Sequence, residues 1–113
     1  MASASSLEMT PQEVVTLQQA GEKLFFVDVR EANEWTLTRI EGAELVPMNT
    51  IPANMQALES KSDEGNLIVY CHHGTRSLQV VAWLREQGVA GCYSMAGGID
   101  RWSQEVDHSV ARY

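Results

Sequence analysis

One short stretch, CHHGTRS at residues 71–77, gathers residue types that could do chemistry. Cys71 becomes a nucleophile when its thiol loses a proton. Two histidines, a glycine and an arginine follow it within five residues. Positively charged side chains and the N–H groups at a helix N-terminus favour a thiolate. The stretch therefore predicts a reactive cysteine that forms or holds an anion.

The residues around this stretch predict a strand before it and a helix after it. Residues 66–70, NLIVY, form an apolar run typical of a strand covered on both faces. Residues 75–88 place apolar side chains at helical spacing and end at a glycine. A chain that turns from a strand into a helix leaves backbone N–H groups without helical acceptors. We expect Gly74 to make this turn and the free N–H groups to point at Cys71.

Apolar runs and helical patterns alternate along the rest of the chain. Further strands are expected at residues 23–29, 43–48 and 92–95, and further helices at residues 10–21, 31–38, 50–60 and 97–106. Thr10 and Pro11 mark the start of the first helix. The alternation predicts a doubly wound, parallel α/β sheet. Ligands of such sheets bind at the carboxyl ends of the strands, where Cys71 lies.

Composition limits the class of protein. The chain has 113 residues, which suits one domain and a monomer by default. Its net charge of -7 argues against nucleic-acid binding, and no apolar run reaches the roughly 20 residues needed to span a membrane. Residues 1–9, which we expect to be frayed, have no secretory pattern. Together with two cysteines, Cys71 and Cys92, this predicts free thiols in the cytoplasm.

Three motifs carry a family resemblance. CHHGTRS resembles the active-site loop of the rhodanese sulfurtransferases, VDVREANEW with IEGA resembles the family's amino-terminal signature, and SMAGGIDRW its carboxy-terminal one. The resemblance implies a single domain over residues 7–106 with a five-stranded parallel sheet, a flexible segment 1–6 and a tail 107–113. It also implies that Cys71 takes sulfur from a donor such as thiosulfate as a persulfide. The acceptor would be cyanide, a small thiol or a sulfur-relay protein, and no metal or organic cofactor is implied.

The resemblance assigns roles to the rest of the loop. The amides from His72 to Arg76 would hold the outer sulfur, and Arg76 would orient an anionic donor. Thr75 and Ser77 could donate hydroxyl hydrogen bonds, although Ser77 could equally satisfy its own helix end. His72 and His73 either favour anions when protonated or simply face solvent.

Asp28 lies near the end of the strand expected at residues 23–29 and Arg30 follows that strand, so both should lie at the same sheet edge as Cys71. Arg30 could add positive charge at the mouth of the site. Alternatively, it pairs with Asp28 or Glu34 and fixes the turn, which is the more usual role of paired charges in loops.

Three other functions compete with sulfur transfer. A cysteine phosphatase has a similar loop but five residues between cysteine and arginine, whereas this loop has four. A binding or regulatory module of rhodanese fold commonly lacks the cysteine that this chain retains. A metal site of Cys71, His72 and His73 is the weakest, because neighbouring residues do not easily converge on one ion and the spacing is not that of zinc ligands.

Overall fold

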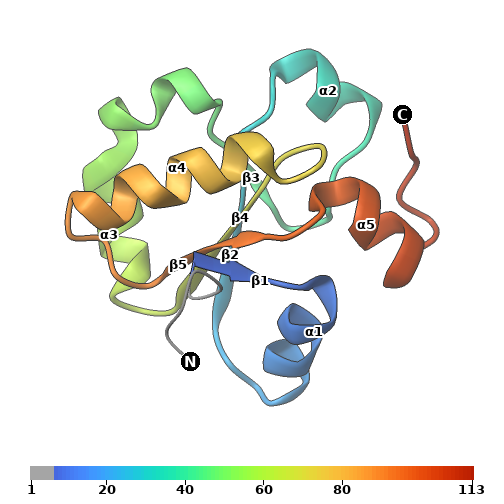
Figure 1. Ribbon diagram of the computed structural model, residues 1–113, viewed down its shortest axis with the longest axis horizontal. Coiled ribbons are helices and arrows are strands. Elements are labelled where there is room, and N and C mark those ends of the chain that lie inside the picture. The colour runs from blue at the N-terminus through green and yellow to red at the C-terminus, as the bar shows by residue number, and fades with distance from the viewer. Residues whose placement is uncertain (1–6) are drawn as a thin grey trace.

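The structure, a computed structural model, describes residues 7–113 (Figure 1). Its strands are β1 (Glu8–Met9), β2 (Leu24–Asp28), β3 (Glu44–Leu45), β4 (Asn66–Tyr70) and β5 (Cys92–Met95). Its α-helices are α1 (Pro11–Gln19), α2 (Ala32–Leu37), α3 (Met55–Ser62), α4 (Thr75–Glu86) and α5 (Gly98–Glu105). Two 3-10 turns, η2 (Met48–Thr50) and η3 (Pro52–Asn54), precede α3.

The strands form one parallel sheet of five strands in the order β1-β5-β4-β2-β3. The predicted doubly wound α/β fold is therefore confirmed. The expectation of a frayed amino terminus was wrong for residues 8 and 9, because Glu8 pairs with Ser94 and Met9 with Met95. The prediction of a flexible segment 1–6 lies outside the described residues.

The helices cover both faces of the sheet. Side chains of β4 alternate, so Leu67 and Val69 pack in one buried cluster with residues of α3 and α4. Ile68 and Tyr70 face the other way and pack in a second cluster with residues of α1 and α5. Burial of β4 on both faces explains why its sequence is a continuous apolar run.

Most helix boundaries follow the expected signals. Thr10 caps α1 with its side chain, and Pro11 occupies the first turn. The helix expected from residue 50 starts later, at Met55, because the chain first makes 3-10 turns with hydrogen bonds from Ile51 to Met48 and from Asn54 to Ile51. Pro52 lacks an N–H group, which suits it to the start of such a turn and not to a helix interior.

The carboxyl edge of the sheet collects the segments that sequence analysis singled out. Cys71 follows β4, Asp28 ends β2, and the glycine pair 97–98 follows β5.

The segment expected to be a tail, residues 107–113, packs back on α5, since Val110 is buried and Ser103 donates a hydrogen bond to the carbonyl oxygen of Val110. Among the described residues, no helix has the length and apolarity required to span a membrane.

Candidate active site

Cys71 lies at the centre of the candidate site, with its side chain buried. Its Sγ accepts hydrogen bonds from the backbone N–H groups of Gly74 at 3.1 Å and Ser77 at 3.4 Å. The Ser77 hydroxyl lies 3.5 Å from the same sulfur. Donors that converge on one sulfur stabilise negative charge on it. The arrangement is therefore able to hold a thiolate.

Two buried serines form a hydrogen-bonded pair, and one of them, Ser77, contacts the sulfur of Cys71. Ser77, in α4, and Ser94, in β5, have no exposed surface, and their hydroxyl oxygens are 2.8 Å apart. Ser77 also donates to the carbonyl oxygen of Gly74 at 3.3 Å. A hydroxyl has one proton, so a donation from Ser94 leaves the proton of Ser77 available for Gly74 or for Cys71. The sequence offered both roles for Ser77, and the structure places it at both contacts.

The turn into α4 requires glycine. Gly74 caps the helix with φ at 105°, in the left-handed region that other residues reach only at a cost. A Cβ at this position would also lie 3.2 Å from the backbone nitrogen of Gly97. The predicted turn at Gly74 is confirmed. Thr75, by contrast, has an exposed side chain, for which the described residues include no hydrogen-bond partner.

The start of α5 docks on the loop backbone. Ile99 donates its N–H to the carbonyl oxygen of Cys71 at 2.9 Å, and Asp100 donates to that of His72 at 3.1 Å. A Cβ on Gly98 would collide with these two carbonyl groups. The glycine pair thus lets α5 approach closely enough for its first N–H groups to bind the carbonyl oxygens of the loop.

Arg76 is at the rim of the loop and is paired. Its Nη1 and Nη2 donate to the two carboxylate oxygens of Glu34, in α2, at 2.7 and 3.0 Å. The hydrogen bonds from Arg76 lower the pKa of Glu34 to about 2, and the same pairing raises the pKa of Arg76. An anionic donor would have to share this guanidinium with Glu34. From the sequence, Glu34 was expected only as a partner for Arg30.

Asp28 and Arg30 form an ion pair with no exposed surface. Arg30 donates from Nε to Oδ1 at 2.9 Å and from Nη2 to Oδ2 at 2.6 Å, and Nη2 also reaches the carbonyl oxygen of Thr38. Burial opposes the charge of Arg30, yet the hydrogen bonds to Asp28 and Tyr113 raise its pKa. The predicted structural role, with Asp28 as the partner, fits these contacts because the pair ties the turn after β2 to residues beyond α2.

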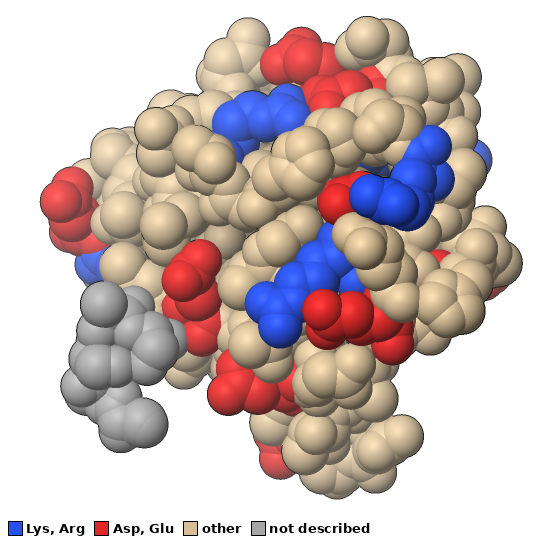
Figure 2. Space-filling view, turned by 45° about the vertical axis from the view of Figure 1, so that its right-hand side comes forward, with Lys and Arg blue, Asp and Glu red and all other residues tan. Residues whose placement is uncertain are grey.

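Charges near the site are therefore compensated in pairs. Besides Arg76 with Glu34, and Arg30 with Asp28, Arg112 donates from Nε to Asp100 at 2.8 Å. On the face shown in Figure 2, basic side chains lie against acidic ones, with no broad basic patch. Local attraction for an anion at Cys71 must therefore come chiefly from the backbone N–H groups of the loop and the start of α4.

The two loop histidines, His72 and His73, directly follow Cys71 at the edge of the site. Their rings stack with centroids 3.9 Å apart, and His72 also stacks on the ring of Tyr113 at 3.9 Å. Burial, followed by the neighbouring His73, lowers the pKa of His72. His73 is exposed and lies 3.9 Å from a carboxylate oxygen of Asp100. His73 thus matches the solvent-facing alternative, whereas His72 is half-buried.

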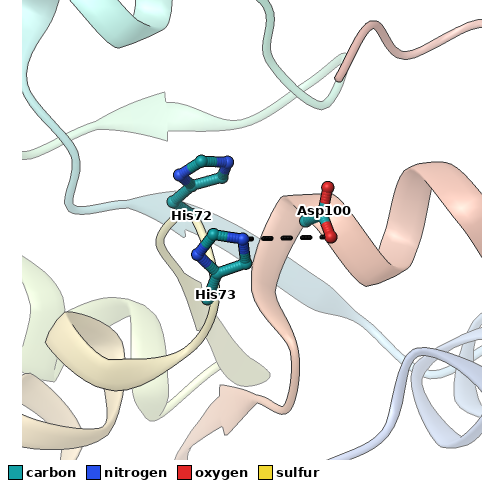
Figure 3. Close-up of side chains that lie close together, drawn as sticks. All are labelled: His72, His73 and Asp100. Carbon is teal, nitrogen blue, oxygen red and sulfur yellow. Dashed lines mark ion pairs between the residues drawn. The ribbon is translucent and has the colours of Figure 1, made fainter. Parts of the chain in front are cut away.

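Figure 3 shows that His72, His73 and Asp100 lie close together. The atoms that could bind a metal ion lie within 4.8 Å of one another. The loop thus brings two adjacent histidines closer to a shared position than the sequence argument allowed. However, an imidazole binds a metal in the plane of its ring, and these rings are stacked. Asp100 accepts a hydrogen bond from Arg112, and His72 donates from Nε2 to the backbone oxygen of Tyr113. These contacts account for the cluster without an ion.

Sequence reasoning missed several residues of the site. Ser94 could have been noticed as a polar residue within an apolar strand, CYSM. Glu34 was noticed, but its pairing with Arg76 depends on how α2 folds over the loop. No sequence signal pointed to Tyr113, which contacts both His72 and Glu34 from a segment expected to be a tail.

Comparison with known proteins identifies the family of the chain. A family profile described as Rhodanese-like domain matches residues 10–105. The thiosulfate sulfurtransferase GlpE of Haemophilus influenzae is 34% identical over 95 residues, which cover 84% of this chain and 86% of GlpE. The probable adenylyltransferase/sulfurtransferase MoeZ of Mycobacterium tuberculosis is 28% identical over 97% of this chain, but the match spans only 28% of MoeZ.

Solved structures agree on the fold. The rhodanese-like domain protein of Staphylococcus aureus superimposes with a TM-score of 0.77 at 27% identity, over 94% of this chain and 97% of that one. A human single-domain sulfurtransferase gives a TM-score of 0.75 at 23% identity, over 88% and 96% of the two chains. The five-stranded parallel sheet, the cysteine loop and these matches together show that the chain belongs to the rhodanese-like domain family.

Proposed function

We propose that the protein is a sulfurtransferase that carries sulfane sulfur as a persulfide on Cys71. The observation that carries the proposal is the convergence of the N–H groups of Gly74 and Ser77 on Sγ, in a loop that leads into α4. Relatives named as sulfurtransferases support the reaction class. The donor we propose is a small sulfane compound such as thiosulfate.

The reaction has two steps. In the first, the Cys71 thiolate attacks the outer sulfur of thiosulfate, the S–S bond of the donor breaks, and sulfite leaves with the electron pair. In the second, an acceptor such as cyanide or a thiolate attacks the outer sulfur of the persulfide. The bond to Sγ then breaks, and the Cys71 thiolate is restored.

The residues of the loop have separate roles in these steps. The N–H groups of Gly74 and Ser77 stabilise negative charge on Sγ at the start and end of the cycle. Arg76 orients an anionic donor from the rim, with Glu34 fixing its position. Several relatives, such as MoeZ, are named for sulfur transfer together with adenylyl transfer, which favours a sulfur-relay protein as one class of acceptor.

Thiocyanate formation from thiosulfate and cyanide tests the proposal. The wild-type protein should turn over, and Cys71→Ser should not, because an alcohol of nearly the same shape cannot carry the sulfur. Cys92→Ser is the matched control, since Cys92 is equally buried but lies at the start of β5. If thiosulfate fails, organic persulfides and polysulfide should be tried as donors. Failure of all of them would favour a non-catalytic binding module.

A further inference from the structure

The segment from Val110 to Tyr113 crosses from α5 to the rim of the catalytic loop. It is anchored by burial of Val110 and by the hydrogen bond from Ser103 to the carbonyl oxygen of Val110. Arg112 adds a second anchor, because Nε donates to Asp100 of α5 at 2.8 Å. We name residues 110–113 the strap. In Figure 1 it follows α5 and ends at the carboxyl terminus, near α2.

Tyr113 contacts the residues around the loop at several points. Its ring stacks on His72 with an interplanar angle of 7°, and its backbone oxygen accepts a hydrogen bond from His72 Nε2 at 3.0 Å. Its hydroxyl donates to Glu34 at 2.6 Å and accepts from Arg30 Nη1 at 2.9 Å. A single side chain is thereby fixed at its face and at its polar end.

Through these contacts Tyr113 connects the start and the end of the cysteine loop. His72 directly follows Cys71, and Glu34 holds Arg76, five residues after Cys71. With His73 stacked on the other face of His72, three rings lie in a row. Tyr113 is 41% exposed, and Cys71 beneath the loop is almost fully buried. The contacts of Tyr113 are with His72, Glu34 and Arg30, around the loop that holds this thiol, which indicates a role in access.

We propose that Tyr113 is a specificity-determining residue, which admits small reagents to Cys71 and excludes bulky ones while the strap is closed. The inference rests on the proposed function only in taking Cys71 as the reacting thiol. A small nucleophile or donor passes beside the three stacked rings. A bulky molecule needs the ring of Tyr113 to leave His72, which also breaks the hydrogen bonds to Glu34 and Arg30.

Alkylation of Cys71 by reagents of two sizes tests the proposal. Iodoacetamide and fluorescein maleimide would be compared in a Cys92→Ser background, so that modification reports on Cys71 alone. Tyr113→Ala should raise the rate with the maleimide by about tenfold, which corresponds to ~1.4 kcal/mol of lost closure. The rate with iodoacetamide should change by less than about twofold, because the small reagent does not need the strap to open.

Two further variants separate the contacts. Tyr113→Phe keeps the ring on His72 and removes the hydroxyl, so its maleimide rate should lie between those of wild type and Tyr113→Ala. Arg112→Ala loosens the strap without changing the ring and should also favour the maleimide. If Tyr113→Ala left the ratio of the two rates unchanged, either because neither rate changed or because both rose equally, the proposal would be overturned. Because alkylation needs no sulfur donor, the result is independent of whether sulfur transfer is found.

Discussion

Gly98→Ala should destabilise the protein more than its φ alone requires. Gly98 has φ at 63°, and a left-handed conformation costs an alanine roughly 1–2 kcal/mol. The added Cβ would also lie 2.5 Å from the carbonyl oxygen of Cys71 and against that of His72. Relief of this collision weakens the hydrogen bonds from Ile99 and Asp100, each worth about 0.5–1.5 kcal/mol. We expect a total loss of about 2–5 kcal/mol.

Gly42→Ala is the matched control. Its φ of 88° carries a similar backbone cost, but no atom lies within 4 Å of an added Cβ. Urea unfolding of the two variants should give a loss of about 1–2 kcal/mol for Gly42→Ala and a clearly larger one for Gly98→Ala. Thiocyanate formation should fall only in Gly98→Ala, since only that change moves the cysteine loop. Equal losses of stability would refute the reasoning that α5 docks on the loop through this glycine.

Three other changes give further predictions. Arg76→Ala should raise the KM for thiosulfate by about tenfold or more, because a charge-assisted hydrogen bond contributes ~1.5–3 kcal/mol. Arg76→Lys should recover only part of the lost binding. If steady-state kinetics gave an unchanged KM in both variants, Arg76 would have no role in donor binding. Cys92→Ser should leave turnover intact, since Cys92 pairs with Leu67, four residues before Cys71; a loss of activity without a loss of stability would contradict this. Ionised Glu34 stabilises the fold above its ordinary pKa of 4.5, and this contribution should disappear as pH falls towards about 2. Urea midpoints should therefore fall less steeply over that interval in Glu34→Gln than in wild type.

The fold was predictable because local patterns and burial agree. The apolar run of β4 is buried on both faces, and Thr10 and Pro11 mark the start of α1 as expected. Gly74 was identified because the turn between a strand and a helix needs a conformation that favours glycine. β1 was not identified, because a strand of two residues has no period of its own and is fixed by pairing with β5.

Residues of the site that depend on tertiary packing were harder to predict. Glu34 joins Arg76 across 42 positions of sequence, and Tyr113 joins His72 across 41. Neither contact leaves a spacing pattern, since each is set by where α2 and the strap lie after folding. Cys71 and its loop were predictable because the nucleophile, the turn and the helix start are consecutive in sequence.

The mass of the protein after incubation with thiosulfate tests the central claim most directly. Sulfur transfer through Cys71 predicts a gain equal to one sulfur atom, located on the peptide that contains Cys71 and removed by cyanide as thiocyanate. The loop supplies converging N–H groups to this sulfur, whereas Cys92 Sγ donates to the carbonyl oxygen of Val89. Sulfur found on Cys92, or a folded protein that stays unmodified with thiosulfate and with every other sulfane donor, would contradict the account.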